Sequence, residues 1–239
     1  MLPGQPVKTW KLPYELHEIS GLAYIEDSLV ACVQDEEGAV YIYNLSEKKI
    51  KEKIRFGPDG DYEGIAYHEG IFYVTNSSGR LHIVAGSDKQ KVKTPLKAKN
   101  NVEGLCFYPP HSLLMSLKDA PYPKRKKKAK TIVSFDLQSQ RLDEKPFLKI
   151  DVPPGKRWGP SGIAVNPQTG EFYIISHLGK KLLIFSKDKT LSKIYTLPRS
   201  LLEQPEGICF LPSGDFLIAS EGKYQKGKLL LFNKLTHEK

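Results

Sequence analysis

The chain has 239 residues and a formal net charge of +9, with 40% hydrophobic and 26% charged residues. This balance is typical of an ordinary globular protein and excludes a disordered chain. No apolar run approaches the ~20 residues of a membrane-spanning helix, so we predict no transmembrane segment. The start of the sequence also lacks the basic and apolar pattern of a signal peptide. We therefore expect one domain over residues 1–239.

Much of the positive charge lies in one segment, PYPKRKKKAK, at residues 121–130. Clustered Lys and Arg attract nucleic acid, an anionic membrane surface or an acidic partner. A solvated surface loop is the simpler interpretation, because charge runs usually stand in water. We treat residues 120–130 as a basic insertion and do not expect nucleic-acid binding.

The three cysteines, Cys32, Cys106 and Cys209, show no C-x-x-C spacing. Their odd number gives neither a disulfide framework nor a zinc site. Each stands among apolar residues, where a thiol behaves as a small buried hydrophobe. We predict that all three are buried.

A short motif centred on a glycine recurs five times. It reads ISGLAYI, YEGIAYH, VEGLCFY, PSGIAVN and PEGICFL, around Gly21, Gly64, Gly104, Gly162 and Gly207. Successive glycines are 40 to 58 residues apart. This range brackets the ~40–45 residues of a four-stranded propeller blade, and the longest interval contains the basic insertion.

The chain opens with an extended segment at residues 7–13. Each glycine motif is then followed by apolar strands and a more polar one, separated by turns rich in Gly, Asp and Asn. In chain order these predicted strands are 28–35, 38–45 and 49–57; 71–78, 79–86 and 89–97; 113–119, 131–137 and 145–153; 171–178, 180–187 and 192–198; and 215–222 and 227–234.

The fifth repeat lacks its polar outer strand. Residues 7–13, VKTWKLP, have the same character as SKIYTLP at the end of the fourth repeat. We predict that they supply the missing strand, which joins the two ends of the chain and protects the sheet edges. The fold class is therefore all-β, a five-bladed β-propeller of four-stranded antiparallel blades, with the last blade closed by the N-terminal strand.

Polar residues gather at one end of the predicted channel. The first strand of each blade lines a propeller channel, so the start of strand one and the end of strand two meet at one face. Residues before the five glycines are Ser20, Glu63, Glu103, Ser161 and Glu206, and those ending strand two are Asp35, Asn76, Lys118, His177 and Glu221. We expect both columns to face the same channel mouth.

Three glutamates held close together repel one another, so they take up protons, pair with cations or bind a metal. Oxygen ligands from Glu63, Glu103 and Glu206 suit a hard cation such as calcium. Alternatively, Lys118 and His177 neutralise the glutamates directly. The sequence leaves both interpretations open, and it leaves open whether the protein is an enzyme.

The repeated ISGL and EGI motifs, with the strand endings VQD and VTN, resemble the SdiA-regulated (YjiK-like) propeller family from about Lys11 to Asn233. NHL-repeat, gluconolactonase and paraoxonase propellers use similar strand openings. In those calcium-dependent hydrolases, a Glu at the opening of an inner strand ligates the metal. The resemblance thus implies calcium ligands at Glu63, Glu103 and Glu206, although those enzymes have six repeats and Lys118 stands where Asn or Asp is expected.

The family resemblance also implies a bacterial periplasmic or cell-envelope location, reached as an exported or lipid-anchored precursor. The leading functional hypothesis is an envelope-associated binding propeller, expected to be a monomer. A polar, calcium-bearing channel mouth takes a small or anionic ligand through Ser20, Asp35, Asn76, Lys118, Ser161, His177 and Glu221.

Two alternatives stay open. The first is a metal-dependent hydrolase of lactone, ester or phosphoester bonds. Its general base is His177 or Glu221. The second is a protein-interaction propeller without a small-molecule site.

Overall fold

The structure is a computed structural model that describes residues 2, 4–122, 129–151, 158–222 and 225–235. The Lys-rich run at residues 124–128 lies outside the described residues. No helix in the described part of the chain is long and apolar enough to cross a membrane.

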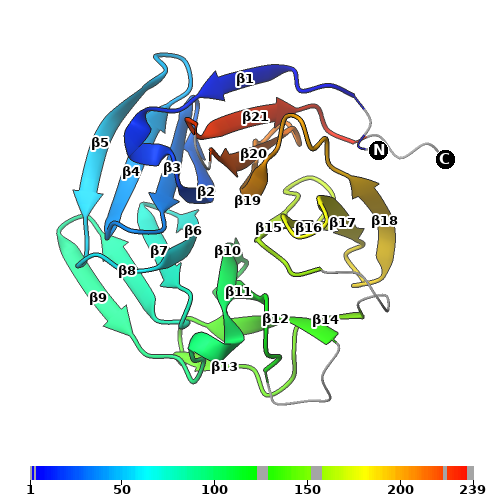
Figure 1. The fold of residues 1–239 in the computed structure, drawn as a ribbon. Helices are drawn as coiled ribbons and strands as arrows, with labels where there is room; N and C mark the ends of the chain where they lie inside the picture. Colours follow the sequence, from blue (N-terminus) through cyan, green and yellow to red (C-terminus); the bar gives the residue numbers. More distant parts are fainter. Residues whose placement is uncertain (1, 3, 123–128, 152–157, 223–224, 236–239) are drawn as a thin grey trace.

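Five antiparallel sheets stand around a central axis (Figure 1), which confirms the predicted five-bladed propeller. The first blade contains β2 (Ile19–Glu26), β3 (Leu29–Gln34), β4 (Ala39–Asn44) and β5 (Lys49–Arg55), and the second contains β6 (Tyr62–His68), β7 (Ile71–Asn76), β8 (Leu81–Ala85) and β9 (Asp88–Val92). The third contains β10 (Val102–Tyr108), β11 (Ser112–Leu117), β12 (Ala129–Asp136), β13 (Arg141–Leu142) and β14 (Leu148–Asp151). The fourth contains β15 (Gly162–Val165), β16 (Phe172–Ser176), β17 (Lys181–Phe185) and β18 (Leu191–Thr196), and the fifth contains β19 (Gln204–Phe210), β20 (Phe216–Glu221), β21 (Lys228–Phe232) and β1 (Lys8–Lys11). Two short 3₁₀ turns, η1 (Tyr14–Leu16) and η2 (Ala98–Asn100), precede β2 and β10.

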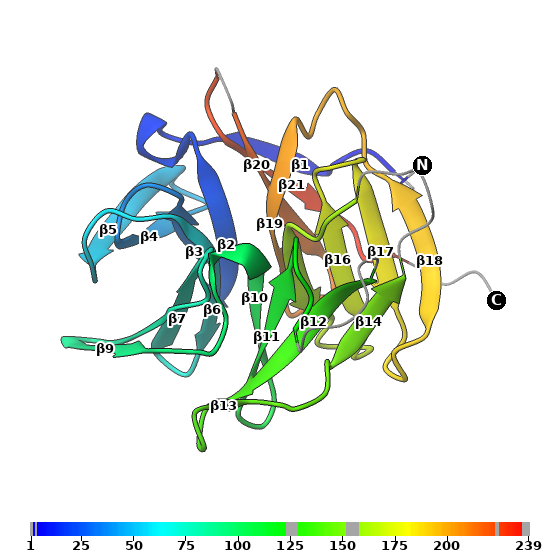
Figure 2. The ribbon, with the colours of Figure 1, turned by 60° about the horizontal axis from the view of Figure 1, so that its bottom comes forward.

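The N-terminal strand closes the ring as predicted. β1 pairs with β21 in the antiparallel register Lys8↔Leu231 to Lys11↔Lys228. Figure 2, which tilts the propeller, shows β1 lying against the last blade and close to the first. The two ends of the chain are therefore held in one sheet, which leaves no open edge between the first and last blades.

The third blade differs from the predicted four strands. Its outer position is filled by two short strands, because β13 pairs with the end of β12 and β14 pairs with its beginning. Pro146 lies between them, and proline has no N–H to extend the ladder. Lys130, the last residue of the predicted insertion, lies in β12 and not in a loop.

The hydrophobic core is divided among the five interfaces between blades. The first and second blades, for example, pack Val33 and Val40 against Val74 and Val84. Four corresponding clusters join the other neighbouring blades. Burying one such side chain contributes about 1.5–3 kcal/mol, so every blade depends on both neighbours. The three cysteines are buried and free, as predicted.

The repeated glycines form the narrowest level of the propeller, where each inner strand meets the next. A Cβ on Gly104 would lie 2.9 Å from the Cα of Gly162, and a Cβ on Gly207 would lie 2.8 Å from the Cβ of Leu22. A Cβ on Gly162 would collide with the backbone oxygen of Glu206. The motif is thus a packing requirement, because the inner strands approach too closely for any side chain at this level.

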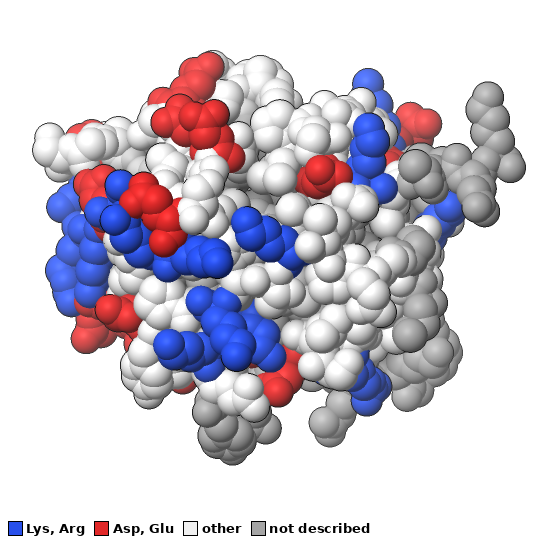
Figure 3. Space-filling model, turned by 90° about the horizontal axis from the view of Figure 1, so that it is seen from above, with Lys and Arg blue, Asp and Glu red and all other residues white. Residues whose placement is uncertain are grey.

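The outer strands are polar and rich in lysine. β5 is exposed along most of its length, and its Lys53 and Arg55 pair with Glu37 at 2.8 Å and 2.5 Å. Figure 3 looks onto the edge that carries β1 and shows Lys and Arg mixed with fewer Asp and Glu. The described outer strands therefore carry basic side chains on the outer wall, away from the channel.

Candidate functional site

β-Bulges occur at the residue before the glycine in four of the five blades. In the second blade the register passes from Tyr62↔Asn76 to Gly64↔Thr75, which leaves Glu63 as the extra residue. Ser20 and Glu103 are extra residues in the same way. In the last blade the register jumps from Pro205 to Ile208 across Glu206. A bulge bends its strand and redirects the side chain of the extra residue.

Glu103 is the most deeply buried carboxyl group at the mouth, with 3% of the residue exposed. Its Oε1 accepts a hydrogen bond from Lys118 Nζ at 2.8 Å. Burial and the nearby Glu206 raise the pKa of Glu103, and Lys118 opposes the rise. The sequence placed these residues in separate columns, and the structure brings them together as an ion pair.

Glu206 forms a second pair with His177. His177 Nδ1 lies 2.9 Å from Glu206 Oε1, at ion-pair distance. The two groups are not aligned as a hydrogen bond, because His177 Nδ1 has no hydrogen-bond partner among the described residues. The second oxygen of this carboxyl, Oε2, is also buried without a partner in the described part of the chain. Glu206 therefore keeps an acceptor free.

Among the described residues, no basic side chain forms a hydrogen bond or an ion pair with Glu63. Burial raises its pKa far above the usual range of a carboxyl, and the negative fields of Glu103 and Glu206 add to the shift. We therefore expect Glu63 to be protonated at neutral pH. A protonated carboxyl both donates and accepts hydrogen bonds, whereas an ionised carboxyl only accepts them.

The space between the three glutamates is very small. The void that they line with the glycine ring has a volume of about 10 Å³. This is close to the minimum that holds one water molecule. A ligand larger than water must therefore bind above the ring, toward the ends of the second strands.

The residues present fit a calcium ion poorly. No group of three or more His, Cys, Asp and Glu side chains within the described ranges is placed to hold a metal ion. Lys118 already neutralises Glu103, and His177 lies on Glu206. The geometry favours glutamates that are paired with basic side chains of the protein itself. Calcium binding by Glu63, Glu103 and Glu206 stays a prediction, which titration with calcium can test.

Asp35 and Glu221 extend the acidic mouth. Burial raises the pKa of Asp35 to about 6, and Glu18 and Glu221 contribute further. Burial and Glu206 also raise the pKa of Glu221, whose Oε2 accepts a hydrogen bond from Gln204. Asp35 Oδ1 is buried with no hydrogen-bond partner in the part of the chain described.

Three other predicted site residues have local partners. Ser20 Oγ donates to the backbone oxygen of Tyr62 at 2.6 Å, and Ser161 Oγ donates to that of Pro205 at 2.6 Å. Both bonds join one blade to the next. Asn76 Oδ1 accepts bonds from Ser78 and from the backbone of Arg80, within its own turn. Ligand contacts by Ser20, Ser161 and Asn76 stay predictions.

Sequence reasoning missed a third polar column, two residues before the pre-glycine position. It contains Glu18, Asp61, Asn101 and Gln204. Glu18 acts on Asp35, Asp61 acts on Glu63, and Gln204 bonds Glu221. The available signal was the recurrence of polar residues at one fixed distance before the repeated glycines.

Among the described residues at the mouth, carboxyl groups outnumber basic groups. Lys118, His177 and Lys180 lie near the carboxyl groups of Glu63, Glu103, Glu206, Glu221 and Asp35. The carboxyls whose pKa is raised release protons at higher pH than ordinary ones, so they can act as acids or bases near neutrality. The free oxygens of Glu206 and Asp35 can accept hydrogen bonds from a bound molecule.

Comparison with known proteins shows the fold. No protein-family model matches the sequence, and no curated protein matches it significantly. Among solved structures, the glutaminyl cyclase of Myxococcus xanthus is 14% identical with a TM-score of 0.69, and the alignment covers 98% of this chain and 97% of that chain. A luciferin-regenerating enzyme is 13% identical with a TM-score of 0.58, over 97% of this chain and 96% of that one.

A streptogramin B lyase is 15% identical with a TM-score of 0.54, over 94% of this chain and 97% of that one. At these identities the likeness shows the fold alone. Membership of the SdiA-regulated family stays a prediction. The chain is a β-propeller whose structural neighbours include enzymes.

Proposed function

We propose that this protein is an envelope-associated propeller that binds a small ligand at the acidic channel mouth. The ligand carries an amine or another cationic donor group. The sequence alone left room for an anionic ligand, and the excess of carboxyl groups around Glu206 argues against one. The envelope location comes from the family resemblance and is part of the proposal.

The observation that carries the proposal is the set of buried polar atoms without partners. Asp35 Oδ1, His177 Nδ1 and Glu206 Oε2 are all buried, and the described residues offer them no hydrogen bond. An unpaired buried polar atom costs about 1–3 kcal/mol, so a bound molecule that satisfies these atoms gains that energy. Two of the three are carboxyl oxygens, which accept hydrogen bonds from an ammonium group.

Thermal unfolding with two probes tests the ligand class. Spermidine serves as the multivalent amine and citrate as the multivalent anion, at matched ionic strength. We expect spermidine to raise the melting temperature and citrate to leave it unchanged, because a molecule that binds only the native state stabilises it. Glu206→Gln should remove most of the spermidine response.

The matched control is Glu52→Gln, a carboxyl exposed on β5 of the outer wall. This variant should respond to spermidine like the parent protein. Stabilisation by citrate, or an equal spermidine response in Glu206→Gln and Glu52→Gln, would contradict the proposal. The same assay with calcium after chelator treatment tests the metal prediction, and Glu103→Gln should abolish any calcium response that is due to the ring.

Hydrolysis of lactone, ester or phosphoester bonds is the second candidate function. It is favoured by the raised pKa of Glu103, about 7, which lets this group exchange protons near neutral pH, and the pKa of Glu221 is raised as well. His177 or Glu221 would then act as general base. The candidate requires no change in the geometry of the mouth.

A substrate panel separates the enzyme from the binding protein. The panel contains a lactone, an aryl ester and an aryl phosphodiester, with and without calcium. It also includes a peptide with N-terminal glutamine, because one structural neighbour is a glutaminyl cyclase. Turnover that disappears in Glu103→Gln but persists in Glu52→Gln would establish the enzyme. Equal background rates in all three proteins would reject it.

A further inference from the structure

The opposite end of the channel opens into an apolar cavity of about 650 Å³. We call it the funnel. It is lined by the residues that follow the repeated glycines along the inner strands, among them Tyr24, Tyr67, Phe107 and Phe210. Its volume falls within the ~300–1,000 Å³ typical of small-molecule sites.

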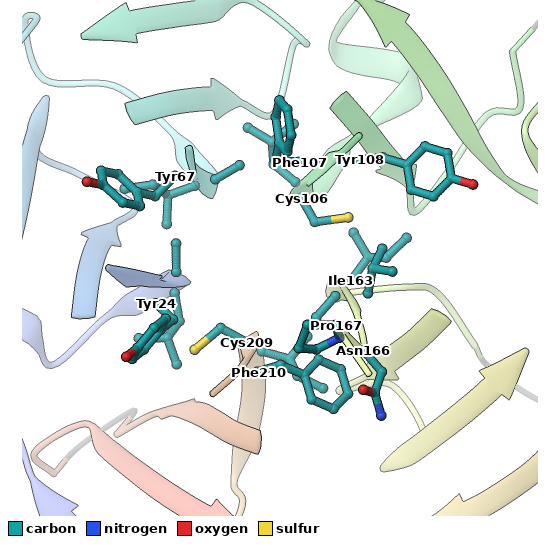
Figure 4. Close-up of a pocket in the computed structure, with 18 of the residues that line it drawn as sticks. Tyr24, Tyr67, Cys106, Phe107, Tyr108, Ile163, Asn166, Pro167, Cys209 and Phe210 are labelled. Atoms are coloured by element: carbon teal, nitrogen blue, oxygen red, sulfur yellow. The ribbon is translucent and has the colours of Figure 1, made fainter. Parts of the chain in front are cut away.

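Aromatic rings from several blades form the rim of the funnel. Figure 4 shows Tyr24 and Tyr67 with their hydroxyl groups turned away from the centre, and Cys106 and Cys209 also line the cavity. These surfaces are apolar. Aromatic side chains bury large areas and favour stacked or edge-on contact with another ring.

The rings on the wall are supported from behind. His68 stacks on Phe107 with 3.7 Å between centroids, and Tyr173 packs edge-on against Phe210 at 4.8 Å. Tyr67 contacts Phe72 at 5.0 Å. A wall held in this way loses little conformational freedom when a ligand binds, which favours affinity.

Charge is nearly absent from the funnel. Among the described residues that line it, only Lys187 is charged, and its side chain is exposed. Burial raises the pKa of the Cys106 thiol to about 12, so that thiol is neutral. A charged ligand would lose its hydration here and gain no opposite partner on the wall, whereas a neutral ligand avoids this cost.

The funnel is separate from the acidic mouth. The glycine ring and the three glutamates stand between the two, and they leave a void of only about 10 Å³. A molecule in the funnel therefore cannot touch the oxygens of Glu206 or Asp35. The two ends of the channel are independent sites in the described structure.

We propose that the funnel is a second binding site, which takes a neutral small molecule with a flat aromatic or conjugated ring. The ring inserts between Tyr24, Tyr67, Phe107 and Phe210 and reaches the sulfur atoms of Cys106 and Cys209. This site does not depend on the proposed function of the mouth.

Nile red, a neutral conjugated dye, is the probe for this site. We expect saturable binding at one site per chain, with a blue-shifted emission and the same affinity at low and high salt, because no ion pair is formed. Bound dye should also slow alkylation of Cys106 by a maleimide, measured by peptide mapping. Cys32 is buried in another interface and reports any general unfolding.

Phe107→Glu places a charge on the funnel wall, and we expect it to weaken dye binding by about tenfold or more. The matched control is Tyr14→Glu, because Tyr14 is 70% exposed and lies outside the funnel. Val165→Lys, at a partly exposed lining position, replaces Phe107→Glu if that variant does not fold. Glu206→Gln should leave dye binding unchanged.

Three results would overturn the proposal. They are non-saturable dye binding, equal affinity in the funnel variant and the Tyr14→Glu control, and Cys106 alkylation that is the same with and without dye. Saturable binding that the funnel variant weakens and the control does not, with protection of Cys106, would support it. The effect of spermidine on the melting temperature is measured separately. The proposal for the mouth and the proposal for the funnel can therefore be rejected independently of each other.

Discussion

The two ends of the channel are built from the same five inner strands and differ in chemistry. At the mouth, bulged residues put Glu63, Glu103 and Glu206 around a void of about 10 Å³. At the funnel, residues three to five positions later give a cavity of about 650 Å³ lined by aromatic rings and thiols. One strand, running from one face to the other, therefore carries both a polar and an apolar site.

The difference shows how a propeller can hold two sites without a second domain. The glycine ring closes the channel between them, because its inner strands leave no space for side chains. Titratable groups stay on one side, where Lys118 and His177 partly balance them. Changes at one end should therefore leave the other end unaffected, which substitutions at the mouth can test.

The largest effect is expected from Lys118→Met at the mouth. It leaves the carboxyl of Glu103 buried without its cation, and breaking such a pair costs about 3–5 kcal/mol. The loss should be smaller at pH 5 than at pH 8, because Glu103 can then bind a proton and become neutral. Chemical denaturation at both pH values measures it.

The double variant Lys118→Met/Glu103→Gln is the control for this substitution. It should recover much of the lost stability, since residue 103 then carries no charge that requires the cation of Lys118. Nile red binding at the funnel should be unchanged in both proteins. An equal loss of stability at pH 5 and pH 8 would show that packing and not charge is responsible.

Gly162→Ala tests the glycine ring that separates the mouth from the funnel. Its new methyl group collides with the backbone oxygen of Glu206 in the next blade, and such overpacking costs about 1–3 kcal/mol. We expect a lower melting temperature together with weaker responses to spermidine and to Nile red. Gly60→Ala is the control, because its nearest contact is the movable ring of Tyr62 at 3.1 Å. Equal effects of the two variants would contradict the role of the glycine ring.

Glu63→Gln should stabilise the protein at high pH. In the native state the raised pKa of Glu63 keeps its proton, while the unfolded chain releases that proton above the ordinary pKa of glutamate. Native stability therefore falls as pH rises between these two pKa values. The amide has no proton to lose, so the variant should lack this decline.

Melting curves of Glu63→Gln and the parent protein from pH 5 to pH 9 measure this difference. Glu52→Gln, on the outer wall, should follow the parent. If Glu63→Gln declines with pH as steeply as the parent, Glu63 is ionised in the native state and the assignment of a neutral acid is wrong.

The smallest effect is expected from Ser20→Ala and Ser161→Ala. Each removes one hydrogen bond between neighbouring blades, and each should cost about 1 kcal/mol. Spermidine binding should persist if these hydroxyls only join blades. Ser192→Ala, at an exposed position, should have no effect on stability. A spermidine response lost in Ser20→Ala would instead support its predicted ligand contact.

The strand pattern was sufficient to predict the fold. Five glycine motifs, apolar strands separated by turns and a missing last strand indicated five blades and closure by residues 7–13, and β1 pairs with β21 accordingly. These features are local or repeated, so they can be recognised without knowing distances. The split outer strand of the third blade was not predicted, because its two parts are only 2 and 4 residues long.

The candidate site was predicted in part. The pre-glycine glutamates and the column containing Lys118 and His177 were identified from position alone, and the structure pairs them. Asn76 occupies the same column and has its amide oxygen engaged in its own turn. Equivalent positions in a repeat share a backbone location, but the local turn determines where each side chain points.

The sequence by itself determined the number of blades, the closure of the ring and the polar character of the mouth, because repeats are properties of the chain. Only the tertiary structure decided that Glu63 is buried beside two other carboxyl groups, that Glu103 and Glu206 have basic partners, and that an apolar funnel opens at the other end. Each of these depends on burial and on distances between blades, to which residues far apart in the sequence contribute.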